Sequence, residues 1–157
     1  MTLTWTWREF NDLSGAEMHE MLAARQRVFV VEQASPYQDA DPLDQLALHL
    51  VIRASDGQFV AYARVLPPEA HYAEPTFGRV LVMPQLRGTG IGREIVRQCL
   101  EKCASVYGAK RIRISAQRYL IDFYTGFGFE PVSPPFDDGG VEHVEMLWVE
   151  TRRAQSP

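Results

Sequence analysis

Three glycines at alternate positions follow an apolar, strand-like run in the segment LVMPQLRGTGIGRE, residues 81–94. Gly88, Gly90 and Gly92 carry no side chain that would keep a ligand away from the backbone. A helix that begins here directs its free N–H groups, and the positive end of its dipole, into the same space. The segment therefore predicts an anion site, with phosphate as the favoured ligand.

Two common phosphate-binding patterns do not fit this segment. A P-loop requires a Lys followed by Ser or Thr after its last glycine, and neither pair follows here. A dinucleotide-binding turn requires G-x-G-x-x-G and an acidic residue near the end of the next strand. The chain instead has G-x-G-x-G, and its next predicted strand ends at Gln117.

The pattern of elements along the chain predicts a mixed sheet with helices on both faces. Alternation predicts a strand over residues 3–10, and Ser14 with Glu17 forms a capping-box start for a helix to about residue 30. Asp56-Gly57 predicts a hairpin turn between two β-rich runs. The predicted strands cover residues 46–54, 58–66, 76–83, 111–116, 129–132 and 142–150, and two further helices cover 91–107 and 119–127.

Composition restricts the class of protein. The net charge of −4, without any basic run, argues against a nucleic-acid binder. The chain has no apolar run long enough to span a membrane and does not begin like a signal peptide, so we expect a soluble cytoplasmic protein. Cys99 and Cys103 share one helical face and complete no zinc set, so we expect core positions and no metal. The apolar run at residues 144–149 suits pairing in a homodimer.

Two motifs resemble the GNAT acyltransferase superfamily. QLRGTG (residues 85–90) matches Q/R-x-x-G-x-G/A, the motif that binds the pyrophosphate of coenzyme A in that superfamily. FYTGFGF (residues 123–129) resembles the second motif, in which a helical Tyr lies beside the sulfur of the coenzyme. RQRVFVVEQASPYQDAD (residues 25–41), His49, FGRVLV (77–82) and SAQRYLIDFY (115–124) are similar to the ElaA-like branch. The chain departs from that branch at Ser35, where Cys is usual, and at Glu142-His143, where Pro-His is usual.

The resemblance implies an α/β (α+β) fold, a single GNAT-like domain over residues 1–157 with a mixed, mostly antiparallel sheet flanked by helices on both faces. Residues 151–157 are expected to form a frayed tail. The implied cofactor is acetyl-CoA, and the implied reaction is transfer of its acetyl group to an amine. The residues expected to bind the coenzyme are Leu81, Val82, Met83, Arg87, Gly88, Thr89, Gly90, Ile91, Gly92, Arg93, Gln117, Phe123 and Tyr124.

The chemistry of acyl transfer assigns roles within this set. The thioester carbonyl needs a fixed hydrogen-bond donor, and the resemblance places it on the backbone near Val82. The leaving thiolate benefits from a proton, for which Tyr124 is the expected general acid. The base that deprotonates the attacking amine stays open. Its candidates are Glu32, His49, His143 and Glu145, and ordered water is an alternative.

The loop SPYQDADPLD (residues 35–44) contains Tyr37, Asp39, Asp41 and Asp44. Three acids in one loop suit an entrance for a cationic acceptor. Aspartates that cap turns explain the same residues equally well.

The leading hypothesis is an acetyl-CoA-dependent N-acetyltransferase that acts on a primary amine of a small molecule or peptide. One alternative is a non-catalytic acyl-CoA-binding sensor or interaction module, which would not need Tyr124. A second is a longer-chain acyltransferase similar to acyl-homoserine-lactone synthases. Those enzymes carry tryptophans near the first helix, whereas Trp5 and Trp7 precede it and Trp148 lies far along the chain.

Overall fold

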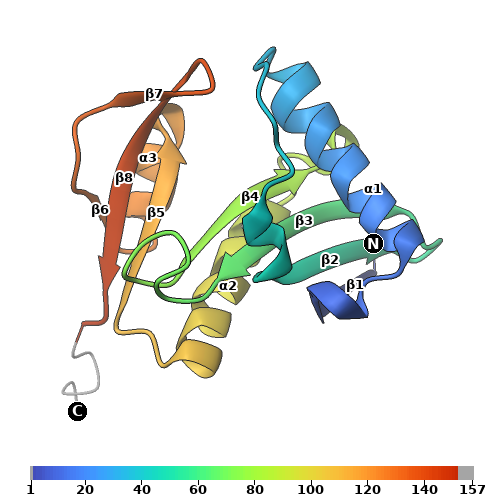
Figure 1. The fold of residues 1–157 in the computed structure, drawn as a ribbon, viewed down its shortest axis with the longest axis horizontal. Coiled ribbons are helices and arrows are strands. Elements are labelled where there is room, and N and C mark those ends of the chain that lie inside the picture. Colours follow the sequence, from blue (N-terminus) through green and yellow to red (C-terminus); the bar gives the residue numbers. More distant parts are fainter. Residues whose placement is uncertain (1, 152–157) are drawn as a thin grey trace.

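The computed structural model describes residues 2–151, which form two antiparallel sheets (Figure 1). The strands of the first sheet follow the order β1-β2-β3-β4, and those of the second follow β5-β8-β6, with β7 also paired to β8. Their bounds are β1 Leu3–Glu9, β2 Leu48–Ala54, β3 Phe59–Leu66, β4 Thr76–Val82, β5 Arg111–Gln117, β6 Phe129–Pro131, β7 Phe136–Asp138 and β8 Val141–Val149. The predicted fold class is confirmed, and β7 is the one strand that the sequence pattern did not predict.

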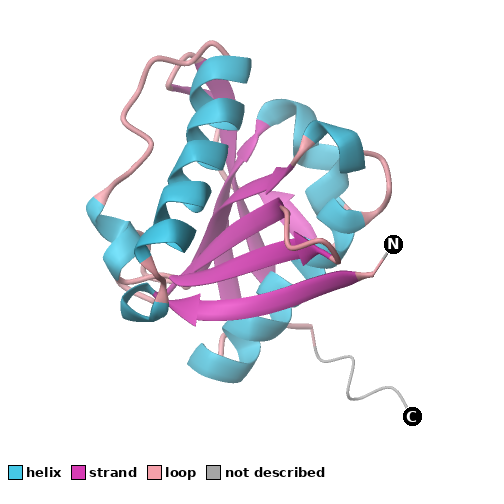
Figure 2. Cartoon of the chain, turned by 90° about the vertical axis from the view of Figure 1, so that its right-hand side faces the viewer, coloured by secondary structure: helices cyan, strands magenta, loops and turns pink. Residues whose placement is uncertain are grey.

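Two long helices cover opposite faces of the first sheet. They are α1 (Gly15–Arg25) and α2 (Ile91–Tyr107), and Figure 2 shows strands enclosed between helices. Alternate residues of the strands face α1 and α2, and all eight residues of β3 are buried. The shorter helical elements are α3 (Ile121–Thr125) and four 3-10 turns, η1 Phe10–Asp12, η3 Pro42–Gln45, η4 Pro84–Leu86 and η5 Arg118–Leu120.

The first helix begins as predicted and ends differently. Ser14 and Glu17 form the capping box, with both reciprocal hydrogen bonds at 3.0 Å. The α-helical part ends at Arg25, and the chain continues as a π-helix, η2 (Gln26–Glu32). A π-helix has a wider turn and is frequent at functional sites. Here it leads the chain to the gap between the two sheets.

Strands β4 and β5 run alongside each other and diverge. The Arg113 N–H donates to the Pro75 carbonyl at 3.2 Å, which joins β5 to the residue before β4. The strands otherwise belong to different sheets and separate toward Val82 and Gln117, as Figure 1 shows. A bulge adds one residue to β4, because Tyr62 pairs with Leu81 while Arg64 pairs with Gly78. Arg79 lies in this bulge with φ +51°.

Cys99 and Cys103 are fully buried on α2, as predicted for core positions. Burial raises the pKa of both thiols, so they stay protonated at neutral pH. Among residues 2–151, no three metal-ligating side chains form a group, and no helix is long and apolar enough to cross a membrane. Most of the predicted frayed tail, residues 152–157, lies outside the described residues.

Candidate active site

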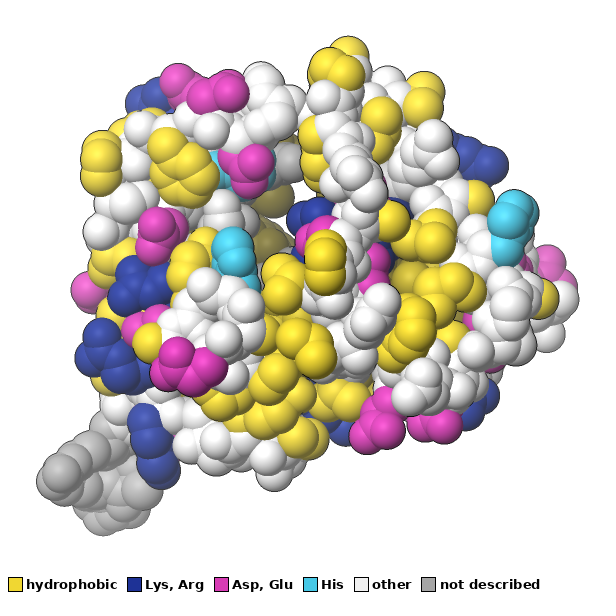
Figure 3. All heavy atoms as spheres, viewed as in Figure 1, with side chains coloured by type: hydrophobic (Ala, Val, Ile, Leu, Met, Phe, Trp, Pro, Cys, Tyr) yellow, Lys and Arg dark blue, Asp and Glu magenta, His cyan; other side chains and the backbone are white. Residues whose placement is uncertain are grey.

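A cavity of about 510 Å³ lies where β4 and β5 diverge. Its walls come from these two strands, from η2 and the loop after it, from residues 71–72 and from the β7–β8 turn. Figure 3 shows a hollow between the part of the molecule that contains the second sheet and the part that contains α1. The size suits a small substrate or the thioester end of a larger one.

The glycine turn lies at one end of this cavity and begins α2. Gly88 and Gly90 have φ +80° and +88°, values that favour glycine, and Gly90 is the N-terminal cap of the helix. The first N–H groups of the helix have no partner within it and remain available for a ligand. Thr89 closes the turn by donating its hydroxyl hydrogen to the Leu86 carbonyl at 2.6 Å. The turn therefore has the geometry of an anion site.

Arg87 connects the turn to β4 and to η2. Its Nε donates to the Val82 carbonyl at 2.8 Å, and its two terminal nitrogens donate to the Glu32 carboxylate at 3.0 and 2.8 Å. These hydrogen bonds lower the pKa of Glu32, which is therefore ionised at neutral pH. Arg87 thus lies beside the turn, but its charge is already paired.

Strand β4 turns one backbone group toward the gap. The Met83 N–H donates to the Val60 carbonyl of β3 at 2.9 Å. Backbone groups alternate in direction along a strand, so the N–H and carbonyl of Leu81 also point toward β3. The Val82 N–H points away from β3, toward β5. The Arg87 hydrogen bond to the Val82 carbonyl agrees with this direction. Of the three predicted backbone residues, Val82 therefore has the free donor.

Tyr124 lies on α3 at the cavity wall and is 7% exposed. Its ring packs against Phe77, Phe123 and Phe129 with centroid separations of 5.1–6.3 Å. Burial, followed by the nearby Cys99 and Tyr119, raises the pKa of the Tyr124 phenol. The phenol is protonated at neutral pH, as any tyrosine is, and the raised pKa makes it a weaker acid than an exposed phenol.

Phe123 lies outside the cavity, next to the Arg93 guanidinium. The guanidinium carbon is 5.8 Å from the centre of the Phe123 ring and 5.5 Å from that of Phe127. Arg93 follows the glycine turn on α2, so these contacts hold its charge close to the predicted phosphate site.

The four candidate bases have very different surroundings. His49 is fully buried and does not line the cavity. Its Nδ1 lies 2.6 Å from the Tyr62 hydroxyl, and its Nε2 lies 2.9 Å from the Asp44 carbonyl. Glu145 is also off the cavity wall and is paired with Arg113 at 3.2 Å. Glu32 lines the cavity but is held by Arg87.

His143 lies on β8, on the cavity wall. Its Nδ1 is 2.8 Å from the Val141 carbonyl, and its ring stacks on Phe136 at 6.1 Å. A carbonyl oxygen only accepts hydrogen bonds, so Nδ1 carries the proton. The neutral ring then has its lone pair on Nε2, which makes His143 the candidate whose chemistry fits a base at the cavity.

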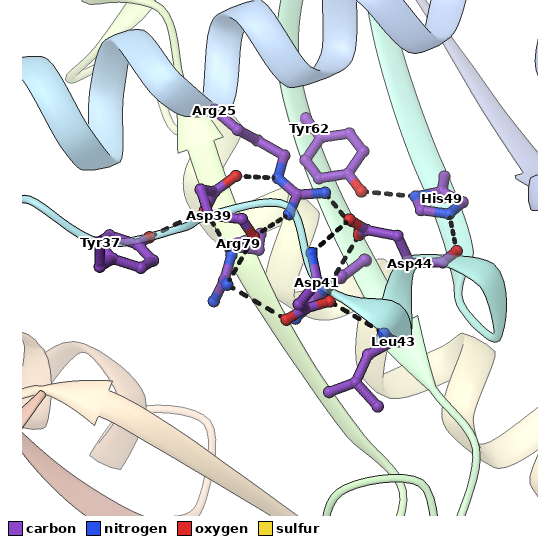
Figure 4. Close-up of polar contacts among 10 residues, drawn as sticks. Arg25, Tyr37, Asp39, Asp41, Leu43, Asp44, His49, Tyr62 and Arg79 are labelled. Carbon is purple, nitrogen blue, oxygen red and sulfur yellow. Dashed lines mark hydrogen bonds and ion pairs between the residues drawn. The ribbon is translucent and has the colours of Figure 1, made fainter. Parts of the chain in front are cut away.

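The acidic loop forms a network of ion pairs (Figure 4). Asp39 pairs with Arg25 and Arg79, each at 2.7 Å, and Asp44 lies 2.6 Å from Arg25 and 2.7 Å from Arg64. Asp41 accepts from Arg64 at 2.7 Å and caps the turn at Leu43. Arg25 is fully buried and Arg64 is 4% exposed. Three carboxylates are thus matched by three guanidinium groups.

This network corrects the prediction of an acidic entrance. The turn-capping interpretation holds for Asp41 and Asp44, which form a reciprocal capping box at η3, and ion pairs hold all three aspartates. Tyr37 donates its hydroxyl hydrogen to Asp39 at 2.9 Å, and the Arg79 guanidinium lies 5.7 Å from the centre of the Tyr37 ring. Burial, opposed by the charge of Arg79, raises the pKa of Tyr37 to about 12. Residue pattern alone did not reveal the arginine partners, because they come from three other elements.

The cavity brings together about half of the predicted site residues. Those that line it are Glu32, Tyr37, Asp41, Leu81, Val82, Arg87, Gln117, Tyr124 and His143. Residues 88–93, at the glycine turn, do not line the cavity. Nor do the other predicted residues, which are Met83, Asp39, Asp44, His49, Phe123 and Glu145.

The segment after η2 reaches across the cavity, a feature that the sequence analysis missed. Gln117 on β5 donates its amide to the Gln33 side chain at 3.1 Å. The Ser35 hydroxyl donates to the Gly139 carbonyl in the β7–β8 turn. These contacts tie the two halves of the molecule together, and a Cβ on Gly139 would meet the Ser35 Oγ at 2.8 Å.

Comparison with known proteins defines the class. The model of the GNAT acetyltransferase domain family matches residues 11–150. A crystal structure of an acyl-CoA N-acyltransferase from Pseudomonas aeruginosa has a TM-score of 0.88 at 33% identity, covering 94% of this chain and 100% of that chain. The chain therefore belongs to the GNAT family of acyltransferases, whose donor is an acyl-CoA.

Close relatives define the branch. The UPF0039 protein of Synechocystis is 51% identical over 148 residues, which cover 94% of this chain and 96% of that relative. Escherichia coli ElaA is 34% identical over 146 residues, covering 92% and 95%. The crystal structure of ElaA has a TM-score of 0.86 and covers 94% of this chain and 99% of that chain. The chain is a member of the ElaA-like branch.

Proposed function

We propose that this protein transfers an acetyl group from acetyl-CoA to a primary amine, by direct attack of the amine on the thioester. The observation that carries the proposal is that Tyr124, a buried phenol, lines the same cavity as Val82, whose N–H is free. The glycine turn lies at the end of the same cavity. A sensor would need the turn but not the phenol.

In this proposal the coenzyme extends from the turn into the cavity. The N–H groups at the start of α2 bind its pyrophosphate, and Arg93 and Arg87 add positive charge. Its pantetheine arm follows β4, where the backbone of Val82 faces the gap to β5. Gln117, at the end of β5, lies on the other side of this path.

The reaction balances with two protein groups. His143 Nε2 takes one proton from the ammonium of the acceptor. The neutral amine attacks the thioester carbon, and the Val82 N–H stabilises the charge that develops on the carbonyl oxygen. The carbon–sulfur bond then breaks, and Tyr124 gives its proton to the leaving sulfur. The second proton that the nitrogen loses restores Tyr124, and His143 releases its proton to water.

The test is thiol release from acetyl-CoA in the presence of a panel of amines, amino acids and peptides, with calorimetric binding of coenzyme A as the control. We expect release with at least one class of amine. The same assay with butyryl-CoA and octanoyl-CoA tests the choice of donor. Faster thiol release from either compound than from acetyl-CoA would show that the transferred group is that longer acyl chain and not acetyl. Coenzyme binding without release from any donor would indicate a sensor.

A further inference from the structure

The charges on the cavity wall are almost all paired. The charged side chains that line the cavity are Glu32, Asp41, Arg64, Arg79, Arg87 and Asp138. The first five are held in ion pairs, Glu32 with Arg87 at 2.8 Å, Asp41 with Arg64 at 2.7 Å and Arg79 with Asp39 at 2.7 Å. Within residues 2–151, the Asp138 carboxylate alone of this set has no ion pair or hydrogen bond.

Asp138 lies on β7 beside the residues that would handle the acceptor. Strands β7 and β8 pair Asp138 with Val141 and Phe136 with His143. Along this short ladder, the residue pair that contains His143 is thus two pairs from the one that contains Asp138. Asp138 is exposed at the edge of the cavity, where an incoming substrate meets it before it reaches the interior.

Ser115 belongs to the same wall but does not offer a free group. Its Oγ is buried beside the Tyr72 phenol, which covers it, so a ligand in the cavity does not reach it. In the pairing of β5 with β8, Ser115 lies opposite Glu145 and Gln117 lies opposite His143, so these four side chains share one face of the second sheet.

Tyr72 covers this region from the loop before β4. Burial, and then the charge of Glu145, raises the pKa of its phenol, while the charge of Arg113 and a hydrogen bond with Ser115 oppose that shift. Tyr37, Tyr119, Phe29 and Phe77 add aromatic surface to the wall. The cavity therefore offers one free negative charge and a mostly uncharged surface.

We infer that the acceptor is a primary amine with one positive charge and no carboxylate, and that its ammonium group is bound by Asp138. This inference rests on the proposed transfer to an amine. A second positive charge on the acceptor would find no further free carboxylate, and a carboxylate would find every arginine of the wall already paired. Asp138 binds the ammonium at the edge of the cavity, and the nitrogen then passes to His143, where it loses its proton.

The test compares three acceptors of similar length and different charge. They are pentylamine, 1,5-diaminopentane and 6-aminohexanoate, with 2-phenylethylamine as an aromatic monoamine. Acetyl-CoA is the donor, and kcat and KM are measured for each acceptor. We expect kcat/KM for the two monoamines to exceed that for the diamine and the amino acid by about tenfold or more.

Two neighbouring substitutions give a matched pair. Asp138→Asn should lower kcat/KM for pentylamine about tenfold, mainly by raising KM. Asp137→Asn removes the same charge from the adjacent residue, which does not line the cavity, and should leave all the constants unchanged. Asp138→Lys should reverse the preference, so that 6-aminohexanoate becomes better than pentylamine. Coenzyme A should bind all three variants with the Kd of the parent protein.

The outcomes separate this inference from the proposed function. Fastest transfer to the diamine or to 6-aminohexanoate, or equal effects of the two asparagine substitutions, would overturn the inference and leave amine acetylation standing. No transfer to any amine, although coenzyme A binds, would overturn both.

Discussion

Arg79 lies in the β4 bulge with a positive φ of +51°, and its Nε is 2.7 Å from Oδ1 of Asp39. A residue with a side chain in this conformation is strained by an amount on the order of 1 kcal/mol or more. Its ion pair holds it against the loop that begins after η2. The same loop forms ion pairs with the buried Arg25 and Arg64, so the bulge, the loop and the helix are held as one unit.

Asp44 is the central carboxylate of this unit, since it accepts from both Arg25 and Arg64. Asp44→Ala leaves two buried guanidinium groups short of a partner, and we expect it to lower the free energy of unfolding by about 3–5 kcal/mol. Urea denaturation followed by circular dichroism measures this. Glu101→Gln, which breaks an exposed pair with Arg97, should change it by less than about 0.5 kcal/mol. Similar small effects of both substitutions would show that the network does not stabilise the fold.

His49 predicts a dependence of stability on pH. Burial lowers its pKa in the folded protein below the ordinary value of 6.5. At a pH between the folded-state pKa of His49 and its unfolded-state pKa of 6.5, the unfolded chain binds a proton that the folded protein does not. The contribution of His49 to stability is therefore present above pH 6.5 and is lost as the pH falls below that value. The slope for one group is at most about 1.4 kcal/mol per pH unit.

Denaturation curves measured between pH 7.5 and 5 detect this slope. In His49→Gln it should be smaller than in the parent protein, whatever the absolute stability of the variant. An unchanged slope would assign the effect to other groups. The lowered pKa values of Asp41 and Asp44 act at lower pH, because their contribution is lost only as the pH falls below about 3.8.

Tyr124 is expected to act in catalysis more than in binding. Tyr124→Phe keeps the aromatic packing and removes the proton donor, so kcat should fall by about 100-fold or more while the Kd of acetyl-CoA stays constant. Steady-state thiol release and calorimetry measure the two quantities. Tyr119→Phe is the control, because Tyr119 also lines the cavity but is 75% exposed. An unchanged kcat in Tyr124→Phe would remove the phenol from the mechanism.

In the proposed mode of binding, Glu32 competes with the coenzyme for Arg87. Both side chains are more than 40% exposed, so their pair contributes little to stability. Glu32→Gln frees the guanidinium for phosphate and should lower the Kd of coenzyme A about two- to fivefold, with kcat unchanged. Calorimetry at low and high salt tests this, and Arg87→Gln should weaken binding. A large loss of kcat in Glu32→Gln would instead make Glu32 the base.

Two glycines of the turn separate stability from coenzyme binding. Gly90 has φ +88°, so Gly90→Ala should cost about 1 kcal/mol or more through backbone strain. Gly92 is helical, and a Cβ there meets no heavy atom within 4 Å. Gly92→Ala should therefore stabilise the protein by about 0.5–1 kcal/mol.

Gly92→Ala should nevertheless weaken coenzyme A binding about tenfold, because the added methyl group lies where the pyrophosphate approaches the backbone. Thermal unfolding and calorimetry on the same samples give both values. A more stable variant that binds coenzyme A as tightly as the parent would place the phosphates elsewhere.

The sequence by itself determined the features that depend on neighbouring residues. Alternation and capping gave the main strands and helices, because side-chain direction and unpaired N–H groups are set locally. The glycine turn, and the Tyr that follows it by about thirty residues, identified the family for the same reason. The predicted end of the first helix, near residue 30, was wrong. The change to a π-helix at Gln26 has no local signal in the sequence that we recognise.

Only the tertiary structure decided the chemistry of the cavity wall. Asp39, Asp41 and Asp44 resemble an acidic entrance in the sequence, but arginines from α1, β3 and β4 neutralise them. His49 and His143 are equivalent candidates until burial separates them. Nothing in the sequence separates Asp138 from the adjacent Asp137, and only the folded chain shows that Asp138 lines the cavity without a partner among the described residues. The effective charge of a side chain depends on what lies within a few ångströms of it, and chain folding brings those groups together from distant positions.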